Sequence, residues 1–166
     1  QDHMDIGKGA NAAAAVVFSL TMIASRLLGD KFFALWGHVK TVQYGAIFGG
    51  GIWGLSLLIG LPLSQSHQKL SLVIVCIGFG AAGFGIGPFF PAFNLAAASI
   101  PGVAPSVGLA RVGLIAIASY FVGPTLLGGI SQLTSLPIAF AFPVLLMMGA
   151  ALQTRFIKVN RLSTEK

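Results

Sequence analysis

The chain has 166 residues, of which 55% are hydrophobic and only 8% are charged. A soluble globular domain carries about 25% charged residues because its surface must face water, so this composition excludes such a domain. Disorder is also excluded, because disordered chains combine low hydrophobicity with high net charge. The net charge of +6 comes with no cluster of basic and aromatic side chains, so no nucleic-acid partner is expected.

Five apolar runs follow one another along the chain. A helix needs about 20 mostly apolar residues to cross the hydrocarbon core, and it satisfies its own backbone hydrogen bonds there. Strands of a membrane barrel would instead alternate apolar and polar residues over about ten positions. We therefore expect an all-α polytopic membrane helix bundle, with a single partial transmembrane domain over residues 1–166. The expected helices cover residues 11–28, 42–63, 70–98, 106–127 and 136–156.

The basic residues divide unequally between the two ends of these helices. With the N-terminus outside, only Lys8 and Lys69 of the ten basic residues lie on the outer side. The positive-inside rule therefore predicts a multi-pass protein of the cytoplasmic membrane with a cytoplasmic C-terminus. Five helices in this orientation, preceded by Gln1 and not by Met, lead us to expect a piece of a longer chain. The basic residues on the inner side are Arg26, Lys31, Lys40, Arg111, Arg155, Lys158, Arg161 and Lys166.

The segment between the first two expected helices is predicted to be a short inner loop, and it carries Asp30, the only acidic residue between Asp5 and Glu165. A carboxylate can accept hydrogen bonds from backbone N–H groups at a helix start, where the helix dipole favours an anion. One interpretation is a conformational latch that holds one helix bundle against another. The alternative is an ordinary solvated loop. The residues of the latch would be Arg26, Gly29, Asp30, Lys31 and Gly37.

Three stretches of the chain carry short motifs with glycine, proline or charged residues. The motif Gly29-Asp30-Lys31, with Gly37 six residues later, is similar to the cytoplasmic loop signature of the major facilitator superfamily of transporters, with Lys31 in place of the usual arginine. Residues 78–91 resemble the glycine-rich tenth helix of bacterial members, and residues 123–129 resemble the Gly-Pro segment that ends the eleventh helix. The resemblance covers nearly the whole chain as helices eight to twelve. It implies a transporter of a small solute, in which two six-helix halves rock about a central site, and it makes a missing N-terminal half the expected partner.

Glycines and prolines are concentrated within the apolar runs. Small residues four positions apart allow helix backbones to approach closely, and prolines interrupt helical hydrogen bonding. This pattern favours close packing and kinks, although glycine and proline are also generally common in membrane helices. The candidate kink and packing residues are Gly83, Gly87, Pro88, Pro91, Gly123 and Pro124.

Polar side chains inside the apolar runs are the candidates for a substrate cavity, because the resemblance implies a site near the middle of the bilayer. Three of them have alternative interpretations. Arg111 can be an interfacial anchor, Asn94 can hydrogen-bond between helices, and Trp53 can face lipid. The candidates are Ser19, Thr21, Trp53, Asn94, Arg111, Ser119 and Tyr120.

Catalytic groups are not evident in the sequence. It has no Asp or Glu within a predicted helix, no nucleophile–base pair, no phosphate-binding loop and no metal-type cluster of Cys and His. The single cysteine, Cys76, lies in an apolar run, where it is expected to act as a small hydrophobe. We therefore expect no enzyme, no cofactor and no metal, and membrane lipid as the surroundings. The alternative to a transporter is a polytopic assembly or structural subunit that transports nothing.

Overall fold

The computed structural model of the chain describes residues 8–154, and within this range all regular structure is helical. The expected all-α class is confirmed. Three helical stretches are long and apolar enough to cross a membrane, namely Ala12–Leu63, Gln68–Ala98 and Pro105–Leu133, and Ile138–Gln153 is a shorter apolar helix. The elements are α1 (Lys8–Leu63), α2 (Gln68–Ile86), α3 (Phe89–Ala98), α4 (Pro105–Leu133) and α5 (Leu136–Gln153).

The element α1 consists of two helical segments that meet at a corner. Gly37 has φ 76° and ψ 162°, a backbone conformation that residues with a Cβ atom rarely adopt. We refer to residues 8–36 as the first segment of α1 and to residues 38–63 as its second segment. The hydroxyl of Thr41 lies 2.8 Å from the carbonyl oxygen of Gly37 and 3.1 Å from that of Phe32, so it can donate to either carbonyl at the corner.

The loop predicted between residues 28 and 42 is wrong in extent, because the first segment of α1 continues as a helix to Gly37 and the second begins directly after it. Only the corner itself falls within the predicted loop. A single glycine costs a helix only about 1 kcal/mol, which neighbouring contacts can offset. Phe32 and Trp36, one helical turn apart, stack with ring centroids 5.4 Å apart. The residues beyond Gly29 therefore supply their own helix-stabilising contact, and the chain turns where a positive φ is required.

The helix expected over residues 70–98 is interrupted between Ile86 and Phe89, at the candidate kink residues Gly87 and Pro88. Pro88 has no N–H to donate to Phe84, four residues earlier. Pro91 falls in the first turn of α3, where proline is tolerated. Pro124 and Pro143 lie inside α4 and α5 without ending either helix.

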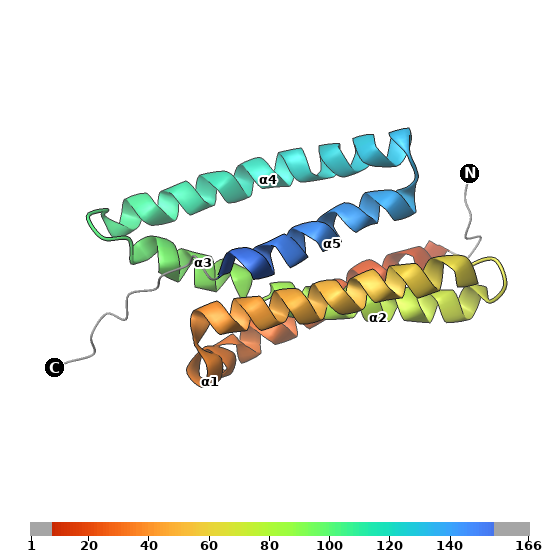
Figure 1. The fold of residues 1–166 in the computed structure, drawn as a ribbon, viewed down its shortest axis with the longest axis horizontal. Helices are drawn as coiled ribbons and strands as arrows, with labels where there is room; N and C mark the ends of the chain where they lie inside the picture. Colours follow the sequence, from red (N-terminus) through yellow and green to blue (C-terminus); the bar gives the residue numbers. More distant parts are fainter. Residues whose placement is uncertain (1–7, 155–166) are drawn as a thin grey trace.

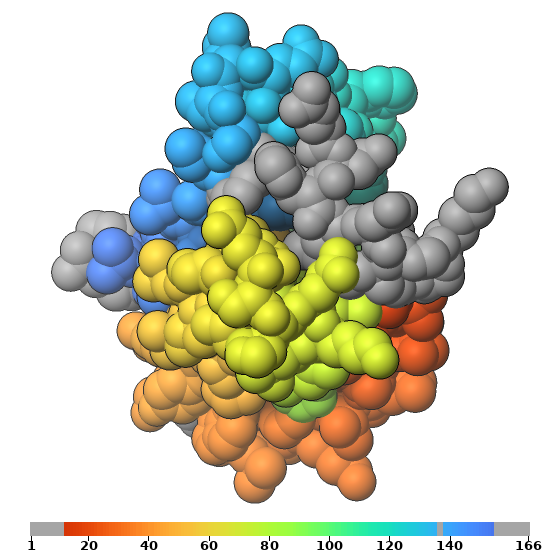
Figure 2. Space-filling view, turned by 90° about the vertical axis from the view of Figure 1, so that its right-hand side faces the viewer, coloured from red at the N-terminus to blue at the C-terminus, as the bar shows by residue number. Residues whose placement is uncertain are grey.

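The helices run lengthwise through the molecule (Figure 1). The corner of α1 and the connection between α3 and α4 lie at one end, on the left of the view. The connection from α1 to α2 and that from α4 to α5 lie at the other end. We call these the corner end and the connection end. Figure 2 views the connection end, where α4 and the start of α5 stand above the closely packed α1 and α2.

Glycines on α2 bring it into backbone contact with both segments of α1. A Cβ atom at Gly85 would overlap the carbonyl oxygen of Gly45 in the second segment, and a Cβ atom at Gly45 would overlap the carbonyl oxygen of Gly85. On the other side of α2, a Cβ atom at Gly83 would overlap the carbonyl oxygen of Phe18 in the first segment. Because lipid tails are as apolar as leucine, such close packing is a principal source of helix association in membranes.

The apolar core lies where the second segment of α1 meets α2 and α5. Trp53 is only 6% exposed and packs with the rings of Phe79 and Phe140, at centroid distances of 5.1 and 6.3 Å. By contrast, α4 has only Gly108 buried along its whole length. A Cβ atom at Gly108 would overlap the carbonyl oxygen of Ala97, so α4 is packed closely against α3 at that point. The chain thus has a tightly packed α1–α2 pair and an α3–α4 pair, joined at the break before Phe89.

Candidate functional site

The break between α2 and α3 is held by a hydrogen bond from a distant part of the chain. The hydroxyl of Ser25, in the first segment of α1, donates to the carbonyl oxygen of Phe84 at 2.5 Å. This carbonyl would ordinarily accept from the residue four positions later, which is Pro88 and has no N–H. Ser25 is 0% exposed, so its hydroxyl is shielded from other partners, and Phe84 is partly buried. We call Ser25, Phe84, Gly87 and Pro88 the helix joint.

Glycine is required at the joint as well as proline. A Cβ atom at Gly87 would lie 2.7 Å from the Cβ atom of Ser25 and 2.8 Å from its hydroxyl oxygen. The candidates Gly83, Gly87 and Pro88 are therefore brought together beside the first segment of α1. A Cβ atom at Gly123 would have nothing within 4 Å, so residues 8–154 make no close contact at this position, and close packing there stays a prediction.

The role of Ser25 at the helix joint could not be predicted from the sequence. The proline at position 88 identifies a carbonyl without its helical donor, but it does not identify the hydroxyl that replaces the donor. Ser25 and Phe84 are 59 residues apart, and several other serines and threonines lie in the apolar runs.

The latch residues all lie in or next to the first segment of α1. Asp30 is exposed in the middle of a helical turn and not at a helix start, so the helix-start geometry expected for it is wrong. Arg26 precedes it by four residues, which puts two exposed and oppositely charged side chains on one helix face. Gly29 is buried, with the ring of Phe33 3.8 Å from the position of a Cβ atom. Gly37 forms the corner, and Lys31 is exposed.

The seven cavity candidates are not gathered in one place. Ser19 and Ser119 are exposed, and each donates to the carbonyl four residues earlier in its own helix, at 2.8 Å. Trp53 is buried in the core, and its Nε1 atom has no hydrogen-bond partner among residues 8–154. The remaining positions on α3 and α4 are Asn94, which is partly exposed, and Arg111 and Tyr120, which are exposed.

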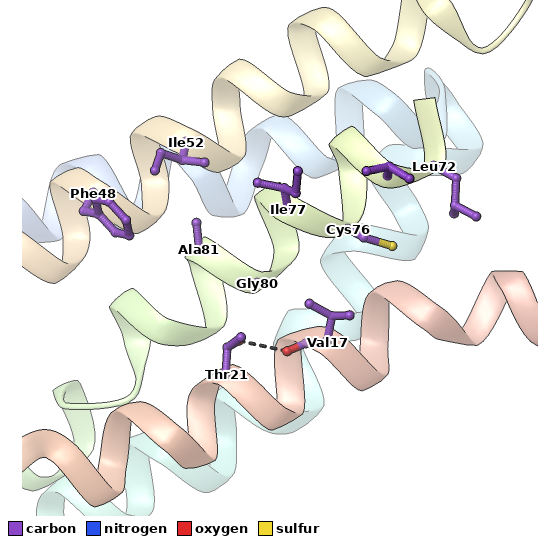
Figure 3. A pocket seen from close by; sticks show the side chains of 10 residues that line it. Val17, Thr21, Phe48, Ile52, Leu72, Cys76, Ile77, Gly80 and Ala81 are labelled. Carbon is purple, nitrogen blue, oxygen red and sulfur yellow. Dashed lines mark hydrogen bonds between the residues drawn. The ribbon is translucent and has the colours of Figure 1, made fainter. Parts of the chain in front are cut away.

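Thr21 is the only cavity candidate on the wall of an apolar groove on the surface of the molecule. This groove has a volume of about 560 Å³ and lies between α2 and the two segments of α1 (Figure 3). The hydroxyl of Thr21 donates to the carbonyl of Val17 at 2.9 Å, so it is occupied within its own helix. Otherwise the walls carry aliphatic and aromatic side chains and the thiol of Cys76. This groove can accept an apolar group, and it offers little to a polar solute.

The described charges are sorted between the two ends of the molecule. Lys31 and Lys40 flank the corner at Gly37, and Arg111 lies in the second turn of α4, which begins at the same end. Lys69 is in the first turn of α2 at the connection end. Which of the two ends faces the cytoplasm stays a prediction. The basic residues from Arg155 onward lie outside the described residues, and so does the structure of the C-terminal tail. No group of three or more metal-ligating side chains occurs within residues 8–154.

A multi-pass membrane helix bundle is the class of protein that these helices define. Consistent with this class, the chain is 27% identical over 141 residues to an uncharacterised MFS-type transporter of Yersinia pestis, a match that covers 85% of this chain and 34% of the relative. It is 28% identical over 127 residues to the membrane protein MosC of Rhizobium meliloti, covering 76% of this chain and 29% of that protein. No family model matches the chain, and no solved structure matches it.

The similarity to the Yersinia pestis protein supports the relationship to major facilitator transporters that the sequence motifs suggested. The chain spans about a third of the length of the relatives it matches. The activity of a whole transporter is therefore a proposal for this chain.

Proposed function

We propose that this chain is the C-terminal portion of a permease that moves a small solute across the cytoplasmic membrane by alternating access. The observation that carries the proposal is the interrupted helix α2–α3, whose two parts are packed against different neighbours. Many transporter folds place their sites at the interface between two halves and move by rocking one half against the other. The break at Pro88 would allow the α3–α4 pair to move against the α1–α2 pair.

The exposed apolar surface of α4 supports a further part of the proposal. A span-length helix with only Gly108 buried leaves a long side free to be covered by other helices. We propose that the missing half of the transporter covers part of it, and that the solute site lies between the halves. Ser119 and Tyr120 lie on α4. In this proposal they would line the solute site together with residues of the missing half.

The test of the proposal is complementation between two polypeptides. The chain expressed alone should insert into the membrane but show no saturable transport of a panel of labelled sugars and amphipathic dyes, because half of the cavity wall is absent. Co-expression with the preceding segment of the complete gene as a second polypeptide should restore transport. Insertion without any transport in the complete protein would instead favour the alternative, a non-transporting polytopic subunit.

We further propose an outer N-terminus and a cytoplasmic C-terminus. The argument is the excess of basic residues at the corner end, together with those of the tail. A reporter enzyme that is active only in the cytoplasm should be active when fused after Lys166. A periplasmic reporter fused at the same point should be silent, and the opposite pair of results would overturn the orientation.

Asp30 remains our proposed latch residue, now with a partner outside the described residues. An exposed pair with Arg26 alone contributes little, so its loss should change transport by about fivefold at most. A partly shielded contact with a helix start in the missing half can bias a two-state equilibrium by about thirtyfold. In the complete protein we therefore expect Asp30→Asn to slow transport by about thirtyfold at unchanged expression, and Asp30→Glu to slow it less. Transport by Asp30→Asn at the normal rate would reduce Asp30 to a solvated surface residue.

A further inference from the structure

We propose that an anionic phospholipid binds along α2, with its headgroup at Lys69 and one acyl chain in the groove between α2 and the two segments of α1. This site is separate from the helix joint and does not depend on the transport proposal. It depends only on the membrane location of the helices.

The α2 wall of the groove lies on the same helix face as Lys69. Residues three, four, seven, eight and eleven positions apart share one face of an α-helix. Counted from Lys69, these positions are Leu72, Val73, Cys76, Ile77 and Gly80, all of which line the groove. Figure 3 shows Leu72, Cys76, Ile77 and Gly80 following one another along α2 between its neighbours. A molecule that lies along this face passes directly from the apolar groove to the lysine.

The length of the groove matches one leaflet of a bilayer. From Leu72 to Ala81 the helix rises about 14 Å, at about 1.5 Å per residue, and half of a hydrocarbon core is about 15 Å. Val17 and Thr21 wall the groove on one side, and Phe48 and Ile52 wall it on the other. Because the Thr21 hydroxyl is already bonded to its own helix, an apolar chain would leave no wall group unsatisfied. An acyl chain is therefore a better occupant than a polar solute.

The end of the groove nearest the membrane surface favours a negative charge. Lys69 is exposed in the first turn of α2, whose N-cap, His67, makes no side-chain capping bond and whose first turn has no acidic residue. The first N–H groups of a helix lack intrahelical acceptors, and the helix dipole attracts an anion there. A second depression at this point is lined by His67, Gln68, Lys69 and Leu70. Asp30, the only carboxylate of residues 8–154, is at the opposite end of the molecule.

These charges select the class of lipid. A phosphatidylglycerol headgroup carries a net negative charge and complements Lys69 and the helix start. A phosphatidylcholine with the same acyl chains carries a compensating cation and is expected to bind less well. One lysine near an anionic lipid surface corresponds to about a fivefold preference.

The test uses the full chain in nanodiscs, with photoactivatable phosphatidylglycerol that carries a diazirine on its acyl chain. We expect crosslinks, mapped by mass spectrometry, on the α2 peptide around Leu72–Gly80, and about fivefold fewer with the matched phosphatidylcholine. Lys69→Gln should reduce the phosphatidylglycerol crosslinks to the phosphatidylcholine level. The control variant Lys40→Gln removes the same charge at the corner end and should leave them unchanged.

A second variant tests the groove itself. Cys76→Phe places a bulky ring among the lining side chains and should reduce crosslinking at the α2 peptide with both lipids. Equal crosslinking of the unmodified chain by the two lipids would mean that only bulk lipid contacts this face, and it would overturn the proposed site. Crosslinks elsewhere on the protein but none at Leu72–Gly80 would mean that protein covers the groove, which also overturns it. Because Lys69 is exposed, the charge comparison remains decisive even if Cys76→Phe fails to fold.

Discussion

Replacing Gly85 with alanine should destabilise the packed α1–α2 pair by about 2–3 kcal/mol. The added Cβ atom would overlap the carbonyl oxygen of Gly45, and it would meet backbone, not a flexible side chain that can turn away. Overpacking of this kind typically costs about 1–3 kcal/mol, and here the two helices must separate along a contact that continues through Gly49. A loss of 2–3 kcal/mol lowers the folded-to-unfolded ratio roughly 30- to 150-fold.

The measurement is reversible unfolding of the chain in mixed micelles by increasing fractions of a denaturing detergent. The control is Gly51→Ala, in the second segment of α1, where a new Cβ atom has nothing within 4 Å. There alanine gains about 1 kcal/mol of helix propensity and loses no contact, so the variant should be neutral or slightly more stable. Equal behaviour of Gly85→Ala and Gly51→Ala would show that the close approach of Gly45 and Gly85 does not support the fold.

The positions of the helices could be predicted from the sequence, and most of their partners could not. A long apolar run in a membrane must satisfy its backbone hydrogen bonds within itself, and a helix does so. Each of the five runs is helical where it is described. The proline at position 88 also marked the break correctly, because its missing N–H is a local property. The corner of α1 lies within the loop predicted between residues 28 and 42, but that loop was predicted too long. Gly29 and Asp30 are typical of a turn, whereas a positive φ is needed only at Gly37.

Contacts between runs were beyond the pattern of any single run. Trp53 was considered a cavity residue because of its depth in the predicted helix, but the structure buries it against Phe79 and Phe140. Depth along a helix is readable from the sequence, while the direction in which a side chain faces depends on the neighbours. For α4, a uniformly apolar run predicted a span but not that its sides would be left open by the other described helices.

Removing the hydroxyl of Ser25 should weaken the helix joint, and the size of the effect should depend on Pro88. In Ser25→Ala the carbonyl of Phe84 loses its donor at 2.5 Å. A buried acceptor left unsatisfied costs about 1–3 kcal/mol, although hydrogen bonds between membrane helices average less, so we expect about 1–2 kcal/mol. Ser119→Ala is the matched control, because its exposed hydroxyl bonds only within its own helix and its removal should cost little.

The double variant separates the joint from a general effect of the mutation. Pro88→Ala restores an N–H four residues after Phe84, so the carbonyl regains a donor within its own helix. In that background Ser25→Ala should cost close to nothing, which gives a coupling energy of about 1–2 kcal/mol between positions 25 and 88 in a double-mutant cycle. Unfolding in mixed micelles supplies the four stabilities, and hydrogen exchange of the amides from Gly87 to Ala92 should be faster in Ser25→Ala than in the unmodified chain. Additive effects of the two substitutions would mean that Ser25 does not compensate for the donor that Pro88 removes, and the joint would then be held by packing against Gly87 alone.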